Sequence, residues 1–365
     1  MATLEEFLSS LQVDGSTDSS IDLSWLDFVD ADDYNIYRAE TSGSTKSDYT
    51  NVATITSTSY TDTGLVNGDD YYYRISANFT ESIDAAGGTT VTNTTINGTE
   101  YRIHAFENTG NNTFTVNNAP SDATVDVLMV GGGGSGGSDN EGGGGGGAGG
   151  MIDTTTDPNI NPLSISEGDY TVTVGAGGSS VSSPAAGNNG GDSSAFGLTA
   201  IGGGGGGGHE TDHNNPAKDG GSGGGGASQD GSLTSGRLGG NGLQPFSASG
   251  GYGNDGGNTT FENIDAGAGG GGAGSVGQNE TSNRAGDGGD GKISSITGSD
   301  IYYAGGGGGS VRNFDPEGTG GLGGGGDGSD GTGQSGVDGK GAGGGSGRSQ
   351  SGSGGDGIVI IRYEI

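Results

Sequence analysis

The stretch TVDVLMVGGGGSGG, residues 124–137, joins an apolar segment directly to a run of glycine. The short run of β-branched and apolar residues ending at Val130 predicts a buried β-strand. The same succession recurs in EGDYTVTVGAGG from Glu167, SSAFGLTAIGGGGGGG from Ser193 and SDIYYAGGGGG from Ser299, and the chain closes with GIVIIRYEI. The fold therefore depends on whether these glycine runs are flexible linkers or ordered elements.

An isolated glycine run should remain disordered, because ordering each residue costs about 1–2 kcal/mol of backbone entropy. Several runs can nevertheless lie side by side as extended helices of three residues per turn, since glycine has no side chain to keep them apart. A collagen triple helix is excluded, because the glycine spacing is irregular and the 365 residues include only 7 prolines. We therefore predict that Gly202–Gly208 forms one rod of a glycine bundle.

The chain is strongly acidic, with 45 acidic and 12 basic residues and a formal net charge of -33. Nucleic acid and anionic membranes would be repelled, so neither is an expected partner. The excess of carboxylates resembles the proteins of extreme halophiles. Cysteine is absent, and no apolar run reaches 18 residues, so we expect no disulfide framework and no membrane insertion.

Short alternating apolar runs between Ile21 and Ala77 predict an antiparallel β-sandwich. Trp25, Tyr37 in YNIYRAE, SYTDTGL from Ser59 and NGDDYYYRISA from Asn67 together resemble a fibronectin type III domain. The resemblance implies that Trp25 packs between two sheets and that Tyr71, following Leu65 and a turn, forms a tyrosine corner. Such domains serve as spacers or as binding modules, and both roles remain open.

The remainder resembles the glycine-rich domains at the ends of phage and viral fibre proteins. VDVLMVGGGGSGG, DYTVTVGAGG, SITGSDIYYAGGGGG and the closing GGDGIVIIRY carry this resemblance. It implies a mainly β protein in which a polyglycine II lattice holds variable loops against a host receptor. The expected domains are a fibronectin type III-like sandwich at 1–85, a β-rich sandwich or collar at 87–130, and a bundle of polyglycine II helices at 131–365 that is closed by a strand at 357–365.

Motifs for enzyme chemistry are weak. His209, Glu210 and His213 fit the zinc motif H-E-x-x-H, but that motif requires a helix, and seven glycines precede it here. GDGGDGK, residues 286–292, lacks the Ser or Thr of a phosphate-binding loop. We expect no enzyme activity and no cofactor, with a polysaccharide depolymerase as the less favoured alternative; no metal ligand is assigned, and a loop site in which His209, Asp212 and His213 hold a metal ion stays open.

The function expected from the sequence is a viral adhesin at a tail fibre or spike tip, made in the host cytoplasm and exposed on the virion of a tailed virus that infects a halophilic archaeon. Its partners would be other tail, fibre or capsid proteins and a host surface-layer glycoprotein or glycan. A capsid or tail decoration protein is the alternative, and monomer and homotrimer both remain open. Aromatic side chains and arginines are the usual anchors of an interface, and histidines add polar contacts. The candidate receptor-binding residues in the loops between glycine runs are His209, His213, Arg237, Phe246, Phe261, Arg284, Arg312 and Phe314.

Overall fold

The computed structural model describes residues 9–28, 31–42, 45–79, 82–208, 216–228, 238–259, 265–281, 284–312 and 316–365. The protein is mainly β, as the sequence predicts, and the described part holds two short 3-10 turns, η1 (Lys46–Asp48) and η2 (Gln244–Phe246), and no α-helix. The chain divides into two compact units, residues 1–81 and 82–365.

The first unit contains two three-stranded antiparallel sheets. Leu23, Trp25, Tyr34 and Ile36 form its buried core, and the rings of Trp25 and Tyr34 meet edge to face with centroids 5.5 Å apart. The hydroxyl of Tyr71 accepts a hydrogen bond of 2.9 Å from the backbone N–H of Val66. In order, the sheets consist of β1 (Gln12–Ser16), β2 (Ser20–Ser24) and β5 (Ser59–Thr63), and of β4 (Thr50–Ile55), β3 (Asp33–Ala39) and β6 (Tyr72–Asn78).

The second unit is built on two larger antiparallel sheets and one β-hairpin. The first sheet has the order β12 (Met151–Asp153), β11 (Thr124–Val130), β19 (Ile358–Glu364), β9 (Thr99–Phe106) and β8 (Thr90–Ile96), with β13 (Leu163–Ser164) also paired to β11. The second has the order β16 (Leu198–Ala200), β15 (Ser193–Ala195), β14 (Gly168–Val174), β10 (Gly110–Asn118) and β7 (Asp84–Ala86). The hairpin pairs β17 (Lys292–Ser294) with β18 (Ile301–Tyr303).

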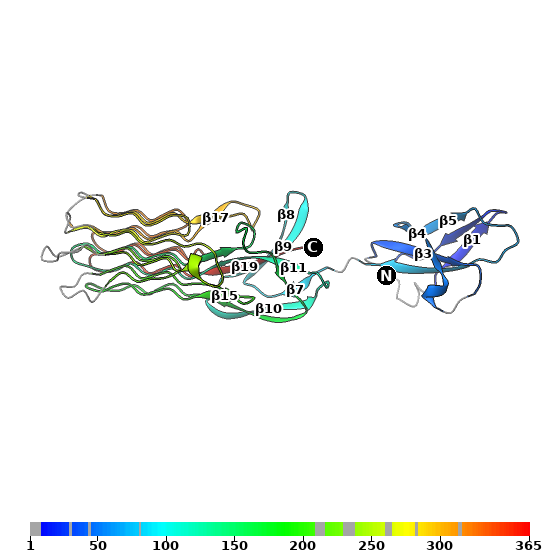
Figure 1. Ribbon diagram of the computed structural model, residues 1–365, viewed down its shortest axis with the longest axis horizontal. Helices are drawn as coiled ribbons and strands as arrows, with labels where there is room; N and C mark the ends of the chain where they lie inside the picture. Colours follow the sequence, from blue (N-terminus) through cyan, green and yellow to red (C-terminus); the bar gives the residue numbers. More distant parts are fainter. Residues whose placement is uncertain are drawn as a thin grey trace. The chain divides into compact units, whose positions relative to one another are not determined.

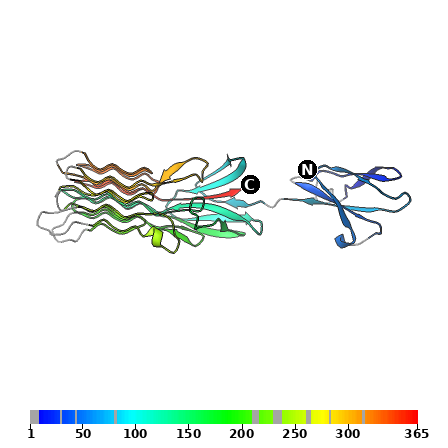
Figure 2. The same ribbon diagram turned by 45° about the horizontal axis from the view of Figure 1, so that its top comes forward.

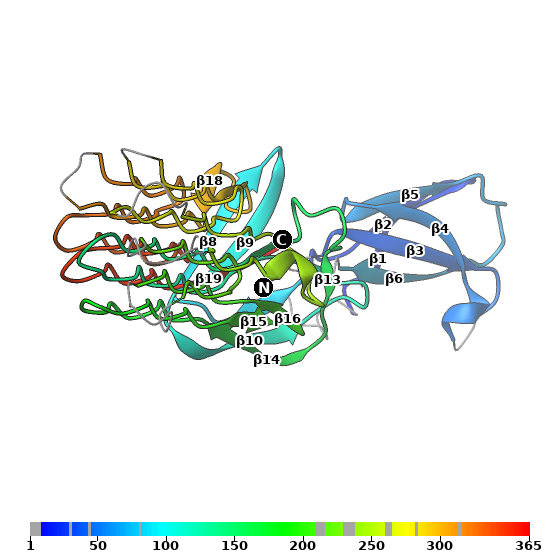
Figure 3. The same cartoon turned by 60° about the vertical axis from the view of Figure 1, so that its left-hand side comes forward.

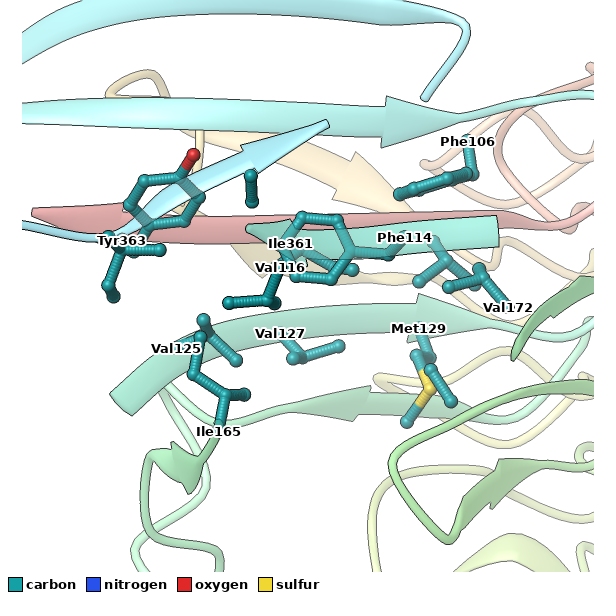
Figure 4. Close-up of a cluster of buried hydrophobic side chains, with 14 of the residues drawn as sticks. Phe106, Phe114, Val116, Val125, Val127, Met129, Ile165, Val172, Ile361 and Tyr363 are labelled. Carbon is teal, nitrogen blue, oxygen red and sulfur yellow. The ribbon is translucent and has the colours of Figure 1, made fainter. Parts of the chain in front are cut away.

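One apolar core joins these two sheets, as Figure 4 shows. Phe114 on β10 and Val172 on β14 pack with Val127 on β11 and Ile361 on β19, and all four side chains are buried. Residues 87–130, expected as a separate collar, therefore share their core with the C-terminal strand. The boundary with the first unit falls between residues 81 and 82, because β7 pairs with β10 of the second unit.

Glycine-rich segments continue from the strands and run side by side away from the sheets (Figures 1, 2 and 3). We call these segments, between residues 131 and 357, the glycine bundle. Their backbone N–H groups donate to neighbouring segments in a rotation that repeats every three residues. From the run 131–138, Gly131, Gly134 and Gly137 donate to the segment 144–150, whereas Gly132, Ser135 and Ser138 donate to 185–191, and Gly133 and Gly136 donate to 352–355.

The close approach of the segments explains why they consist of glycine. A methyl carbon added at Gly133 would overlap the carbonyl oxygen of Ala342, and one added at Gly145 would overlap that of Gly307. The positions that do carry side chains inside the bundle are small, such as Ala148, Ser222 and Ala268, each fully buried. Hydrogen bonds between segments thus satisfy a backbone that no side-chain core covers.

Candidate functional site

The segments of the glycine bundle turn at the end remote from the sheets, and we call this region the distal end. Eight residues of nearly extended chain, from Gly131 to Ser138, carry the backbone about 25 Å from β11. Backbone bridges join Ser138 to both Ala185 and Gly347, and Ser329 to Gly347. The described part of the distal end comprises the turns 138–142, 180–185, 329–332 and 347–350, together with Thr281, Arg284, Val311 and Arg312.

Of the two predicted binding residues that the structure describes at this end, Arg312 is slightly more accessible than Arg284. Its backbone N–H donates to the carbonyl of Asp265, and its guanidinium lies 3.6 Å from Glu141, with 42% of the side chain exposed. The neighbouring Val311 is fully buried against Ala266 and Ala285. This arrangement anchors the backbone of Arg312 and leaves its guanidinium at the surface beside Glu141.

Arg284 has a different role, because it is built into the bundle. Its guanidinium pairs with Asp287, and Asp287 also accepts hydrogen bonds from the backbone N–H and hydroxyl of Thr319 at 2.8 and 2.9 Å. Arg284 therefore supports the link between two segments, and only part of its side chain is available to a ligand.

Phe246 is not near these arginines. It ends the short turn η2 at the sheet side of the bundle, and 88% of its surface is exposed. Beneath it, the buried Gln244 accepts a hydrogen bond from Ile201 at 2.7 Å and donates to Thr199 and Gly250 at 3.2 and 2.6 Å. The predicted set is thus divided between the two ends of the bundle.

The other five predicted residues, His209, His213, Arg237, Phe261 and Phe314, lie outside the described residues, as does the whole H-E-x-x-H motif. Within the described ranges, no group of three or more histidine and acidic side chains is placed to hold a metal ion.

Arg348 is a distal residue that the sequence argument missed. Its Nε donates to the carbonyl of Asn140 at 2.9 Å, and its guanidinium pairs with Asp330. One side chain therefore joins three distal turns. The sequence does mark these turns: SDNE (138–141) and RSQ (348–350) interrupt glycine runs in the same way as the predicted binding loops.

The model of a glycine-rich domain family matches residues 107–364. The chain belongs to this glycine-rich domain family. The match begins directly after β9 and ends with β19, so it includes β10, β11, β14, β19 and the whole glycine bundle, whereas β7, β8 and β9 precede it. No curated protein matches the chain. Across the described segments, no helix is both long and apolar enough to cross a membrane.

Proposed function

We propose that this protein is a viral adhesin at a tail fibre or spike tip, in which the glycine bundle is a polyglycine II lattice that presents distal loops to a host receptor. The supporting observation is the rotation of hydrogen bonds with a period of three along 131–138. A helix of three residues per turn directs its N–H groups in three directions in this way.

A crowded, hydrogen-bonded bundle suits an adhesin because it holds its turns in place before the receptor arrives. Ordering loops at the moment of binding costs about 0.5–1.5 kcal/mol for each immobilised side chain, and a pre-ordered surface avoids part of that cost. The distal end carries Arg312 and Arg348, each ion-paired with an acidic side chain, on turns that backbone bridges hold in place. Polar, charged turns of this kind fit a glycan or glycoprotein better than an apolar ligand.

The first unit is proposed to be a fibronectin type III-like spacer that links the glycine-rich domain to other tail, fibre or capsid proteins. Its two sheets, the packing of Trp25 on Tyr34 and the Tyr71 contact with Val66 support that proposal.

The net charge of -33 supports a halophilic host, because molar salt screens self-repulsion at a Debye length of about 3 Å. The receptor is then proposed to be a surface-layer glycoprotein or its glycan. The alternative is a decoration protein of the same virion, which uses the glycine-rich domain only to attach to the particle.

The test is binding of the full chain, at molar salt, to intact host cells and to cells stripped of their surface layer. Arg312→Ala combined with Arg348→Ala removes two of the distal guanidiniums, and Phe246→Ala is the matched control at the sheet side. Saturable binding to intact cells only, lost in the double arginine variant and kept in Phe246→Ala, is the expected result.

Two results would change the proposal. A folded protein that binds neither cell preparation but binds purified virions would support the decoration role. Binding lost in Phe246→Ala and kept in the arginine variant would move the receptor contact to the sheet side of the bundle.

A further inference from the structure

Two acidic side chains are buried in the turn that follows β12, in the sequence DTTTDPN, residues 153–159. Asp153 is 0% exposed and Asp157 is 7% exposed. The backbone N–H of Asp157 donates to the carbonyl of Asp153 at 2.9 Å. This i to i+4 bond closes a single turn of the chain, so the two acidic residues lie one turn apart.

The hydrogen bonds available in the turn leave part of this negative charge uncompensated. Oδ1 of Asp153 accepts from the backbone N–H and hydroxyl of Thr155 at 2.9 and 2.6 Å, whereas its Oδ2 is buried and has no partner. Oδ1 of Asp157 accepts from the backbone and side-chain amides of Asn159, both at 3.0 Å. Among the described residues, no ion pair reaches either carboxylate.

The side chains of Tyr252 and Lys292 lie close to this turn. The hydroxyl of Tyr252 donates to the carbonyl of Thr156 at 3.3 Å, and the ammonium of Lys292 lies over the Tyr252 ring, 4.1 Å from its centroid. Burial and then the charge of Asp157 raise the pKa of Tyr252. Burial, followed by the charge of Asp153, raises the pKa of Tyr303 to about 12. The charge of Asp153 also contributes to the raised pKa of Tyr252, so both carboxylates lie near this one side chain.

Burying an ionised carboxylate is costly unless the charge is paired or coordinates a metal ion. We propose that Asp153 and Asp157 bind one hard divalent cation, with Ca²⁺ as the best fit. Ca²⁺ takes six to eight oxygen ligands, which carboxylates, backbone carbonyls and water can supply in flexible geometry. With two carboxylates, the site fits the weak class of extracellular calcium modules, with Kd of about 10⁻⁴–10⁻³ M.

The cation would stabilise a junction between the sheets and the glycine bundle. Thr154, inside the same turn, accepts a hydrogen bond from the backbone N–H of Val127 on β11 at 2.8 Å. Met151, at the start of β12, is fully buried and bridges to Tyr252. The proposal concerns folding stability and does not depend on the adhesin function.

The experiment uses the full chain, stripped with EDTA, at a constant molar NaCl concentration. Its unfolding temperature is measured against increasing CaCl₂ and, separately, MgCl₂. Tb³⁺ luminescence excited through tyrosine gives a second readout, because the Tyr252 hydroxyl donates to the carbonyl of Thr156 inside the same turn. The variants are Asp153→Asn and Asp157→Asn, and Asp122→Asn is the matched control at an exposed carboxylate.

We expect Ca²⁺ to raise the unfolding temperature saturably and to displace Tb³⁺ from a single site. Each site variant should weaken apparent Ca²⁺ affinity by at least about tenfold, and Asp122→Asn should not. The inference is overturned by an unfolding temperature that ignores Ca²⁺, or by a Ca²⁺ response that persists in Asp157→Asn. Asp157→Asn decides the outcome even if Asp153→Asn does not fold.

Discussion

Gly145 shows at the residue scale why the bundle excludes side chains. Its N–H donates to Ala268 at 2.9 Å, its carbonyl accepts from Gly225 at 2.8 Å, and a methyl carbon would overlap the carbonyl of Gly307. Three different segments therefore surround one residue. No rotamer can relieve the overlap, because the neighbours are backbone atoms.

We predict that Gly145→Ala lowers the free energy of unfolding of the second unit by about 3 kcal/mol, since overpacking must separate segments and break their hydrogen bonds. Gly331→Ala is the control, because its nearest neighbour, the Ser329 hydroxyl, would be 3.8 Å from the new carbon. Calorimetric unfolding at molar salt measures both. Equal stability of the two variants would contradict the steric argument.

His104 is a buried titratable side chain of the β core. Its Nδ1 donates to the carbonyl of Gly87 at 2.7 Å, so in the neutral ring Nε2 accepts from the hydroxyl of Tyr363 at 3.1 Å. Burial lowers the pKa of His104 below its ordinary value of 6.5, against the opposing effect of the Gly87 hydrogen bond. The folded protein therefore holds the ring neutral at a pH where the unfolded chain binds a proton.

The free energy of unfolding should therefore fall as pH drops below about 6.5, with His104 contributing up to about 1.4 kcal/mol per pH unit. His104→Phe removes this contribution. The difference in free energy of unfolding between the wild type and the variant should therefore become smaller as the pH falls. Denaturant unfolding from pH 8 to pH 5 measures it. Wild-type and variant curves that stay parallel throughout that range would refute the role of His104.

At the element scale, acidic and amide side chains complete the hydrogen bonding of the outer segments. Gly202 donates to Asp192, and Gly205, three residues later, donates to Asn189. In another outer segment Thr319 donates to Asp287, and Leu322, again three residues later, donates to Asp290. Outer segments lack a neighbour on one side, so their N–H groups need another acceptor. Part of the acidic composition therefore has a structural role.

We predict that Asp290→Ala destabilises the second unit by about 1 kcal/mol, because the N–H of Leu322 loses the acceptor that now lies 2.9 Å away. Asp290→Asn keeps an oxygen acceptor and should retain most of the stability. Thermal unfolding of the three proteins provides the comparison. If Asn and Ala were equally destabilising, charge rather than the hydrogen bond would be the source of the effect.

At the scale of the whole molecule, a net charge of -33 accompanies a second unit that backbone hydrogen bonds between segments and several apolar clusters hold together. Self-repulsion of this size opposes compaction at low ionic strength. Trp25, the single tryptophan, lies in the first unit. Its fluorescence therefore follows that unit, while circular dichroism reports both.

We predict that the unfolding temperature rises between 0.1 M and 3 M NaCl, as the Debye length falls from about 10 Å to below 3 Å. Circular dichroism and Trp25 fluorescence, recorded together, show whether both units respond. An unchanged unfolding temperature over this range would show that self-repulsion does not limit the stability of the fold.

The mainly β class and the glycine-rich domain could be predicted from local pattern. TVDVLMV before Gly131 predicts a strand by its composition, and the long glycine runs predict ordered segments because only glycine allows such close packing. Strand propensity and the lack of a side chain are properties of single residues and short stretches, so they can be inferred from the sequence without knowledge of the fold.

The positions of the candidate binding residues and the neighbours of each glycine run depend on packing between segments that are distant in the sequence. Phe246 and Arg312 both occupy breaks in the glycine pattern, yet they lie at opposite ends of the bundle, because a break can turn the chain at either end. Arg348 contacts Asn140, which lies 208 residues away in the sequence, and Asp330, which lies 18 residues away. Glycine runs of nearly identical composition hold no information about which neighbour each one takes; side-chain breaks, strand pairing and the hydrogen bonds between segments fix that choice only in the folded chain.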